Sequence, residues 1–316
     1  MIGSVKKGKK RWIVTIATLL LGSEALFAES PAETPASGEP STAEIAKMMK
    51  NPLSYLWMFA TQNDTFWMDG VLPGADKIHV NSFTIMPVMP MQLTENYKLV
   101  LRPWLPVVSI DMPRDRGDLH WDGDELAGYY PTGIRNTSWK TGIGDVGFWA
   151  AVASNENAKP PYIFGAGITA QFDTASRKEF GSGRYSAGPM ALAFYVGEDW
   201  TFGGILQHWW DYAGDDERKH VNKTAFQYFY YYNLTPETSL GASPSISYDW
   251  VEDKYDFPVG LGVNTTVKIG KLPVGLSATL YYHTSNNDLI HNKWQFQIGI
   301  TPILPSPEWS RKPLFD

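Results

Sequence analysis

The 316-residue sequence contains no cysteine, and after its first segment it contains no long apolar run. Without cysteine there is no disulfide framework and no lipid-modified cysteine behind a leader. Without a further run of about 18 apolar residues there is no later candidate for a membrane-spanning helix. Metal-ligand clusters, phosphate-binding loops and nucleotide fingerprints are also missing from the sequence, so we expect neither a cofactor nor a bound metal.

The N-terminus has the pattern of a secretory signal peptide. Basic residues precede an apolar stretch at 12–22, and small residues follow, with cleavage expected after Ala25 or Ala28. A buried N-terminal helix is the alternative, but the charge asymmetry favours export. Residues 1–28 hold five basic residues and one glutamate, so the rest of the chain, with the total at −6, carries −10. Such an acidic chain is a poor partner for nucleic acid. Residues 29–40 are predicted to form a disordered linker.

Aromatic residues are abundant, with 13 Trp, 16 Tyr and 15 Phe. Many aromatics without a long apolar run fit a transmembrane β-barrel, whose strands alternate lipid-facing apolar residues with inward-facing polar residues. In 161–174, for example, Phe164 and Ile168 share one face, and Thr169 and Gln171 share the other. The same alternation recurs along most of the chain that follows the linker.

Twelve alternating segments predict an all-β fold, namely an antiparallel, up-and-down transmembrane β-barrel over residues 53–305. An even count places both barrel ends on the periplasmic side, with short periplasmic turns and longer external loops, above all 111–141. A soluble two-sheet sandwich also alternates, but its strands are usually about 5–6 residues long. The predicted strands span 57–69, 78–91, 98–110, 142–154, 161–174, 185–197, 200–213, 223–234, 239–250, 255–269, 274–285 and 293–304.

The densest aromatic run places six rings within residues 226–232. On a strand, one face of this run carries Phe226, Tyr228, Tyr230 and Tyr232. The other face carries Gln227, Phe229, Tyr231 and Asn233. We expect the first face to contact lipid, with its end tyrosines in an interfacial girdle, and the second face to line the lumen.

Two short segments flank the predicted barrel. Residues 41–52 begin with a capping box, Ser41 to Glu44, and are expected to form a periplasmic helix that ends at Pro52. This helix is either a surface feature or a stopper in the barrel mouth. Residues 306–316 form a C-terminal tail beyond the last predicted strand.

Inward-facing positions of the predicted strands form the candidate solute path. They are Arg102, Asp145, Trp149, Gln171, Asp173, Gln207, Trp209, Asp211, Gln227, Phe229, Tyr231, Asn264, Tyr281, Gln295 and Gln297. Rings mixed with amides suit a planar, weakly polar solute, although they also suit a filled interior. Arg102 and Asp145 lie on adjacent predicted strands, as a structural ion pair or as part of a polar path.

Proline occurs in an unusual pattern on two neighbouring predicted strands. Pro87 and Pro90 lie on one strand, and Pro103 and Pro106 lie on the next. Each proline removes a backbone donor from the hydrogen-bond ladder, so we expect bulges or a local opening of the wall here.

Several segments, in order along nearly the whole mature chain, resemble an outer-membrane family known as "MetA-pathway of phenol degradation". They include EIAKMMKNPLSYLWMFATQNDTFW at 44–67, GIGDVGF at 142–148, WTFGGILQHWWDYAGDD at 200–216 and SISYDW at 245–250. The resemblance implies a barrel that takes up aromatic or hydrophobic small molecules. The chain departs from the family pattern by ending in PSPEWSRKPLFD.

Residues 281–287 suggest a catalytic alternative. His283, Ser285 and Asn286 resemble the His-x-Ser-Asn pattern of outer-membrane phospholipase A and of lipid A deacylases. A histidine and a serine two residues apart on a strand share a face, so the imidazole could activate the hydroxyl. An outer-membrane lipid hydrolase is therefore the second candidate function.

The external loop offers a third function. Loop 111–141 could recognise or anchor a partner, and Asp118, Asp122, Asp124 and Glu125 within it could bind calcium. Their spacing differs from an EF-hand, which favours a solvated loop. Our first expectation is an outer-membrane channel or transporter for small aromatic or hydrophobic solutes. Its expected partners are outer-membrane lipid and lipopolysaccharide, the barrel-assembly machinery and a small-molecule solute.

Overall fold

The computed structural model describes residues 45, 56–71, 74–113, 119–124, 128–134, 137–154, 162–287 and 289–314, with the backbone alone over 112–136. The predicted signal peptide, the linker at 29–40 and almost all of the helix at 41–52 lie outside these residues. Ile45 is the one described residue of that helix, and it is helical and buried. None of the helices in the described part of the chain is long and apolar enough to cross a membrane.

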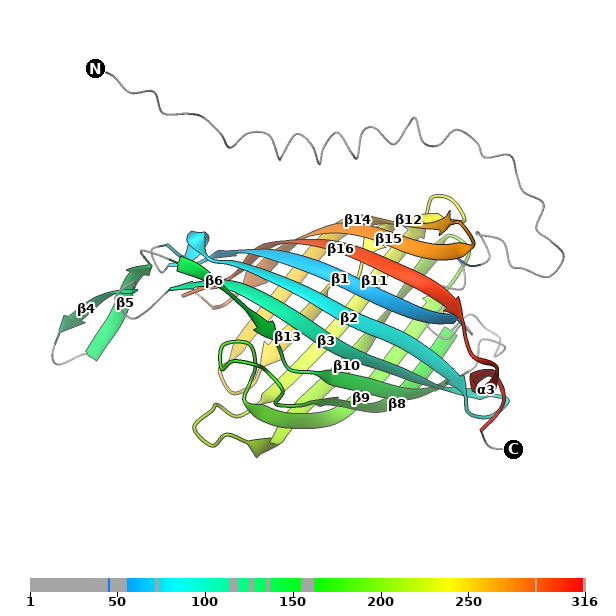
Figure 1. The fold of residues 1–316 in the computed structure, drawn as a ribbon, viewed down its shortest axis with the longest axis horizontal. Coiled ribbons are helices and arrows are strands. Elements are labelled where there is room, and N and C mark those ends of the chain that lie inside the picture. The colour runs from blue at the N-terminus through cyan, green and yellow to red at the C-terminus, as the bar shows by residue number, and fades with distance from the viewer. Residues whose placement is uncertain are drawn as a thin grey trace, which may run out of the picture. The chain divides into compact units, whose positions relative to one another are not determined.

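Sixteen strands make up most of the described chain (Figure 1). The first eight are β1 (Leu56–Asp69), β2 (His79–Gln92), β3 (Tyr97–Pro113), β4 (Leu119–Asp124), β5 (Gly128–Ile134), β6 (Thr137–Ile143), β7 (Gly147–Ser154) and β8 (Tyr162–Gln171). The last eight are β9 (Arg184–Val196), β10 (Trp200–Gly214), β11 (Asn222–Asn233), β12 (Thr238–Ala242), β13 (Ser245–Asp249), β14 (Lys254–Ile269), β15 (Leu272–Ser285) and β16 (His291–Pro305). The short helices are η2 (Ala75–Lys77) and α3 (Glu308–Arg311).

The main sheet is a closed antiparallel barrel, because β1 pairs with β2 on one edge and with β16 on the other. It contains 14 strands. Strands β6 and β7 both pair with β3, and β12 and β13 both pair with β11 and β14, so each couple occupies one wall position. The barrel therefore has the 12 wall strands that the alternation predicts, and the predicted all-β, up-and-down fold is confirmed.

The longest predicted loop contains structure that the sequence analysis missed. Strands β4 and β5 form a separate two-stranded hairpin within 111–141, and β3 and β6 extend toward it. The predicted strand at 142–154 is also broken, since Gly144–Val146 interrupt it. Between the pairs Trp104–Gly147 and Val107–Ile143, two residues of β3 lie opposite three residues, which is a bulge of one residue.

The prolines of β2 and β3 do not produce a bulge in the seam between these two strands. The seam keeps one register from Val80–Ile110 to Gln92–Lys98. Instead, ladder pairing is absent between Ile85–Leu105 and Met89–Leu101, where the missing proline donors leave a short gap. The expected bulge is therefore wrong for this seam, and the local opening takes the form of a ladder gap.

The two ends of the barrel differ in their connections. We call one the turn end, since it has the short turns 93–96, 197–199, 234–237 and 270–271 and both ends of the wall, Leu56 and Pro305. The other is the loop end, with the connections at 70–78, 114–136, 172–183, 215–221 and 286–290. In outer-membrane barrels the short turns face the periplasm and the longer loops face outward.

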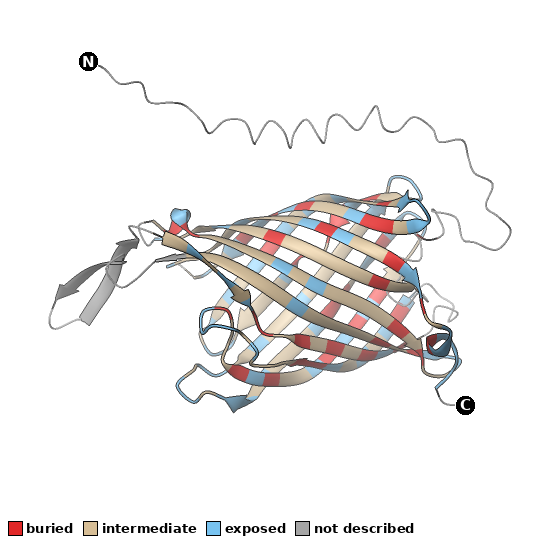
Figure 2. Ribbon diagram, in the orientation of Figure 1, coloured by how far each residue is buried: buried red, intermediate tan, exposed pale blue. Residues whose placement is uncertain are grey.

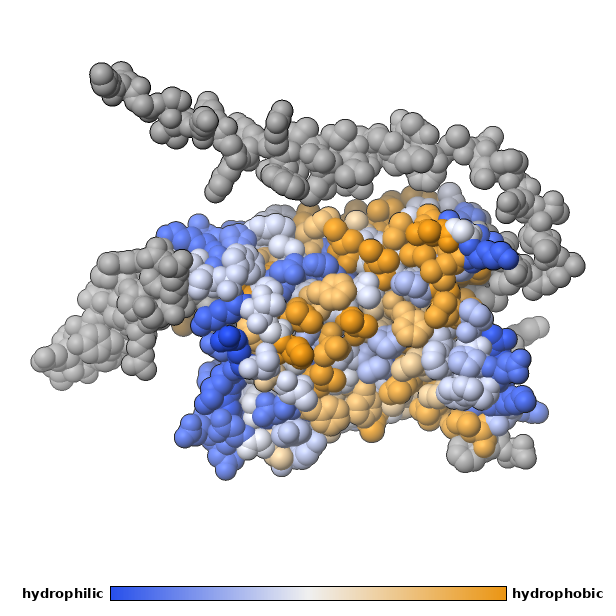
Figure 3. Space-filling view, in the orientation of Figure 1, coloured by the Kyte–Doolittle hydropathy of each residue, from blue (hydrophilic) through white to orange (hydrophobic). Residues whose placement is uncertain are grey.

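Outward-facing side chains form an apolar band around the wall. Buried and exposed residues alternate along the strands (Figure 2), and apolar side chains gather between two polar ends on the visible face (Figure 3). Trp200 and Tyr232 meet near the turn end at 4.8 Å between ring centroids, and Trp210 lies near the loop end. The ten residue steps from Trp200 to Trp210, at about 3.3 Å each and a tilt of about 40°, span roughly 25 Å. This height matches the apolar band of an outer-membrane barrel.

Strand β11 carries the dense aromatic run, and its predicted facing is confirmed. Phe226 and Tyr232 are exposed on the outside, and Gln227, Phe229 and Tyr231 face the interior. Outside, the rings of Phe226, Tyr228 and Tyr230 stack in a row with centroids 6.3 and 6.0 Å apart. Tyr228 and Tyr230 also use their hydroxyl groups to donate hydrogen bonds to the backbone of β14.

The interior is packed along one side of the wall. Val100 of β3, Trp149 of β7, Ile163 of β8, Phe194 of β9 and Ile205 of β10 belong to one cluster of buried apolar side chains. The tail at 306–316 adds a contact near the turn end, where the ring of Trp309 in α3 meets Trp57 edge-on at 5.9 Å. Leu314 N donates to Gln92 O of β2, so the chain after the last strand lies back against the wall.

Candidate functional site

The half of the barrel near the turn end contains a cavity of about 270 Å³, which we call the first cavity. Its apolar wall carries Trp149 of β7, Phe194 of β9 and Phe229 of β11. The rings of Phe194 and Phe229 stack with centroids 4.5 Å apart. Six of the predicted path residues line this cavity: Arg102, Trp149, Gln227, Phe229, Tyr231 and Asn264.

Arg102 projects from β3 into the first cavity. It lies directly across the seam from Trp149, which is buried, so the guanidinium emerges beside an indole ring. Arg102 Nη1 donates to Gln227 Oε1 at 3.4 Å, and Nη2 contacts Met86 Sδ at 3.4 Å. Gln227 in turn donates through Nε2 to Ser243 O at 3.4 Å, which places the arginine in a chain of polar groups.

A second cavity of about 280 Å³ lies in the half near the loop end. Gln171, Trp209 and Lys223 line it together with Ala225 and Ser245. Ala225 precedes Gln227 by two residues on β11, so the two side chains share a face and lie about 7 Å apart. Consecutive inward positions of β11 therefore border consecutive cavities, which follow one another along the barrel.

Between the two cavities, Gln207 of β10 reaches across β9. Gln207 Nε2 donates to Thr169 Oγ1 of β8 at 2.9 Å. On β9, Gly188 lies opposite Thr169 and Met190 lies opposite Gln207. A Cβ at Gly188 would lie 1.9 Å from His208 O, so this backbone approach requires glycine. The predicted path residue Gln207 is thus part of a fixed interior contact.

A polar network covers the opposite wall, where β15 and β16 meet β1. Asp64 Oδ1 accepts from Gln295 Nε2 at 2.6 Å and from Gln297 Nε2 at 2.9 Å. Tyr281 donates to Gln297 Oε1 at 3.3 Å. The predicted path residues Tyr281, Gln295 and Gln297 are therefore brought together, and they surround a buried carboxylate, Asp64.

The same network contains His283 and leaves the hydrolase geometry unformed. His283 Nδ1 lies 3.0 Å from Asp256 Oδ1 and Nε2 lies 2.9 Å from Gln295 Oε1. Ser285 Oγ donates instead to Tyr255 O at 2.8 Å, and Asn286 Nδ2 donates to Asp253 O. Both nitrogens of the imidazole are engaged elsewhere, so the serine hydroxyl does not meet a general base in this structure.

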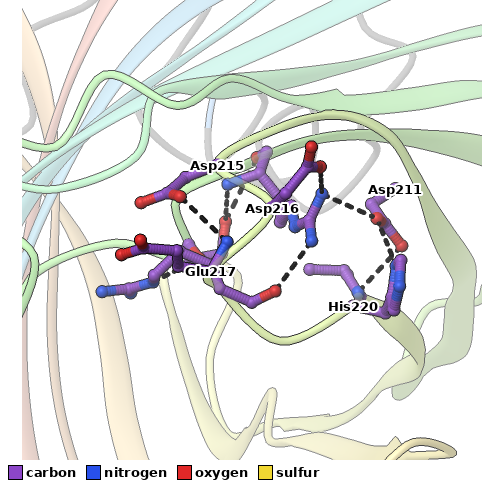
Figure 4. A network of polar contacts seen from close by, with 9 residues as sticks. Asp211, Asp215, Asp216, Glu217 and His220 are labelled. Atoms are coloured by element: carbon purple, nitrogen blue, oxygen red, sulfur yellow. Dashed lines mark hydrogen bonds and ion pairs between the residues drawn. The ribbon is translucent and has the colours of Figure 1, made fainter.

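Charged residues at the loop end hold the loops together (Figure 4). Asp211 accepts from Val221 N at 3.0 Å and lies 2.9 Å from His220 Nδ1 and 3.8 Å from Arg184 Nη1. Arg218 donates to the backbone oxygens of 178, 181 and 182, which ties the loop after β10 to the loop after β8. The predicted path residue Asp211 therefore belongs to the rim of the barrel.

Asp145 also lies at the loop end, so the alternative of an ion pair between Arg102 and Asp145 is wrong. Asp145 Oδ2 accepts from Ser182 N at 2.7 Å and from Gln171 Nε2 at 3.2 Å. Trp149, the cross-strand neighbour of Arg102, is four residues from Asp145 along the chain, and four residues of strand span roughly 13 Å. Asp173 lies in the bend after β8, which ends at Gln171, so this residue is not on a wall strand as predicted.

One carboxyl in a loop at the loop end has a shifted pKa. Glu179 lies in the loop after β8, with Oε1 3.5 Å from Lys140 Nζ of β6. The hydrogen bond from its own backbone N–H, together with the nearby lysine charge, lowers the pKa of the Glu179 carboxyl. In the described residues there is no group of three or more His, Asp or Glu side chains placed to hold a metal ion.

Several residues of the interior escaped the sequence analysis. Phe194, Thr201 and Ser243 line the first cavity, and Asp64 and Arg184 are buried polar residues. Phe194, Thr201 and Asp64 occupy inward positions of predicted strands, so the period of two could have found them. Nothing in the local pattern indicates that residues from ten different strands converge on one cavity.

Comparison with known proteins gives the fold a context. No protein-family model matches the chain, and no curated protein matches it in sequence. Among solved structures, the COG4313 outer membrane channel from Pseudomonas putida F1 is similar at a TM-score of 0.59 and 13% identity, over 79% of this chain and 95% of that chain. The CymD monoaromatic hydrocarbon channel is similar at a TM-score of 0.42 and 9% identity, over 81% of this chain and 92% of that chain. The likeness to the first structure shows that this chain has the fold of an outer-membrane barrel protein.

Proposed function

We propose that this protein is an outer-membrane channel for small aromatic or hydrophobic solutes, exported with a cleaved signal peptide. The observation that supports the proposal best is the succession of two cavities inside a closed barrel, the first lined by aromatic rings and amides. Ligand sites usually combine apolar walls with a few polar groups in about 300–1,000 Å³. The first cavity, at about 270 Å³, lies just below this range, so it suits a small solute.

The wider family assignment is part of the same proposal. The ordered motifs of the sequence resemble the phenol-degradation family, which supports uptake of aromatic or hydrophobic small molecules. Outer-membrane lipid and lipopolysaccharide would surround the apolar band, and the barrel-assembly machinery would insert the chain. The helix at 41–52 remains a candidate stopper, and loop 111–141 remains a candidate recognition surface.

Placement is tested by fractionation and by heat modifiability. We expect the protein in the outer-membrane fraction, with a folded gel band that shifts on boiling. Recovery from the periplasm without such a band would contradict the proposal.

Passage through the interior is tested by narrowing the second cavity. Ala225→Trp places an indole in a space of about 280 Å³, so we expect single-channel conductance in planar bilayers to fall about twofold or more. Ala166→Trp is the matched control, because Ala166 is exposed on the outer face of β8. Equal conductance in the two variants would show that solutes do not pass along this route.

The hydrolase alternative is tested in the same preparation. Removal of a serine nucleophile abolishes nearly all turnover, whereas a channel hardly changes when one hydroxyl at its rim is lost. We expect neither the parent protein nor Ser285→Ala to release fatty acid from liposomes, while both pass an aromatic solute. Lipid release by the parent that disappears in the variant would support the hydrolase instead.

A further inference from the structure

Arg102 is a cation without an anion. In the described part of the chain no carboxylate lies within ion-pair distance of its guanidinium, and its partners are the neutral Gln227 and Met86. A buried arginine at the rim of the barrel, Arg184, by contrast lies 3.4 Å from Asp216 and 3.8 Å from Asp211. A charge withdrawn from bulk water without a counter-charge is costly, so a residue in this position gains from a mobile anion.

The surroundings of Arg102 restrict the kind of anion. Trp149 lies across the seam from it, and the stacked pair of Phe194 and Phe229 forms another part of the cavity wall. An inorganic ion would leave the cavity-facing sides of these rings uncovered. A solute with an aromatic or apolar body covers the rings and places its charged group at the guanidinium. Arginine binds a carboxylate through two parallel hydrogen bonds, so a carboxylate suits this position.

Two further polar atoms of the first cavity lack partners. Thr201 Oγ1 and Asn264 Nδ2 are buried and have no hydrogen-bond partner among the described residues, and Thr201 is 1% exposed. Both residues line the cavity, as does Arg102. Buried polar groups are nearly always hydrogen-bonded, so a solute with hydrogen-bonding oxygens would supply the partners that these two atoms lack.

Glu237 is the one carboxylate among the described residues of the first cavity, and it lies at the turn end. Continuing the register of β11 with β12, Glu237 lies opposite Thr235, eight residues along from Gln227. Eight residues of strand span about 26 Å, so Glu237 does not neutralise Arg102. Thr235 Oγ1 donates to Glu237 Oε2 at 3.3 Å, which holds this carboxylate at the turn.

We propose that the first cavity binds aromatic or otherwise apolar monocarboxylates, with the carboxylate on Arg102 and the ring against Trp149, Phe194 and Phe229. The inference rests on the proposed channel function and adds the charge class of its solutes. Neutral aromatic molecules of the same size pass along the same route, but Arg102 does not hold them.

The test compares benzoate with benzyl alcohol, which share a ring and differ in charge. Binding to the folded full-length protein in detergent is measured by calorimetry, and uptake is measured in liposomes. We expect Arg102→Gln to weaken benzoate binding about tenfold to a hundredfold and to leave benzyl alcohol unchanged. Arg102→Lys keeps the charge but loses the bidentate geometry of the guanidinium, so its affinity for benzoate should lie between those of the parent and Arg102→Gln.

Lys223→Gln is the control, because it removes a positive charge from the second cavity without altering the first. Equal loss of benzoate binding in Lys223→Gln and Arg102→Gln would show that benzoate responds to the overall charge of the lumen and not to a site at Arg102. Loss of both solutes in Arg102→Gln, or of neither, would overturn the proposal. If Arg102→Gln fails to give a heat-modifiable band, Arg102→Lys decides, since parent-like benzoate binding there would also overturn it. A parent protein that takes up neither solute would contradict the channel function, whereas uptake of benzyl alcohol without a preference for benzoate would contradict the carboxylate site alone.

Discussion

Strand β14 has two neighbours, and its two seams are built differently. Toward β15 the ladder runs through 14 consecutive pairs, from Asp256–Ser285 to Ile269–Leu272. On the other side, β14 forms four pairs with β12 and three pairs with β13. Between these two groups, residues 257–261 of β14 pair with neither strand.

The broken seam coincides with proline and with the aromatic run of β11. The common register of β12 and β13 would place Ser243 opposite Gly260 and Ser245 opposite Pro258. Instead, Tyr228 donates its hydroxyl hydrogen to Pro258 O at 2.8 Å, and Tyr230 donates to Gly260 O. Because hydrocarbon contains no water to satisfy a carbonyl, a wall without backbone pairing needs another donor.

The difference between the two seams shows how one wall both satisfies its backbone groups and lines a cavity. A complete ladder satisfies the backbone but keeps every residue in the plane of the wall. At the broken seam, Ser243 lines the first cavity, and Tyr231 and Gln227 of β11 lie beside it. On the outer face, the hydroxyl groups of Tyr228 and Tyr230 stabilise β14 along the stretch where it has no ladder partner.

The largest effect is expected where the complete ladder is broken. The carbonyls of Pro258 and Gly260 face the broken seam, so Val259 between them faces β15. Val259→Pro removes that ladder donor and should lower the free energy of unfolding by about 3 kcal/mol or more. Urea titration in phospholipid vesicles measures the change, and Val259→Ala, which keeps the donor, should cost less than about 1 kcal/mol. Similar midpoints for the two variants would show that the seam toward β15 is not what stabilises β14.

The next effect concerns the tyrosines of the broken seam. Replacing Tyr228 and Tyr230 together by Phe keeps the stacked rings but leaves two carbonyls without donors. Each unsatisfied buried group costs about 1–3 kcal/mol, so the pair should lose roughly 2–6 kcal/mol in the same urea titration. Tyr232→Phe is the control on the same strand and face, since its hydroxyl makes no hydrogen bond within the described chain. A double variant as stable as Tyr232→Phe would mean that the hydroxyl groups are not needed.

The barrel and the facing of its strands could be predicted from the sequence, because lipid and lumen impose a period of two on every strand. Phe226 and Tyr232 on the outside and Phe229 on the inside follow from this rule alone. The roles of Tyr228 and Tyr230 could not be predicted, since they depend on the register between strands β11 and β14, which are not consecutive. Sequence reasoning noticed Pro87, Pro90, Pro103 and Pro106, but not Pro258, whose meaning depends on its neighbours.

The candidate site was predictable in part for the same reason. Alternation assigned Arg102 to the interior, and the structure places it in the first cavity. Alternation could not decide its partner, because Asp145 lies in the interruption between β6 and β7, where the period of two ends. The convergence of Phe194, Thr201 and Ser243 on the first cavity depends on the curvature of the closed wall, which a single-strand pattern does not contain.

The smallest effect is expected at Pro258, the neighbour of Val259. Its nitrogen faces the broken seam, where no ladder bond exists for a donor to restore. Pro258→Ala gives the unfolded chain more freedom and adds an N–H without a ladder partner, so it should cost about 1–3 kcal/mol. Urea titration beside Val259→Pro then compares proline at two adjacent positions whose backbone nitrogens face different seams. A clear gain in stability for Pro258→Ala would contradict this account, because it would mean that the ladder closes once a donor is supplied and that proline itself keeps the seam open.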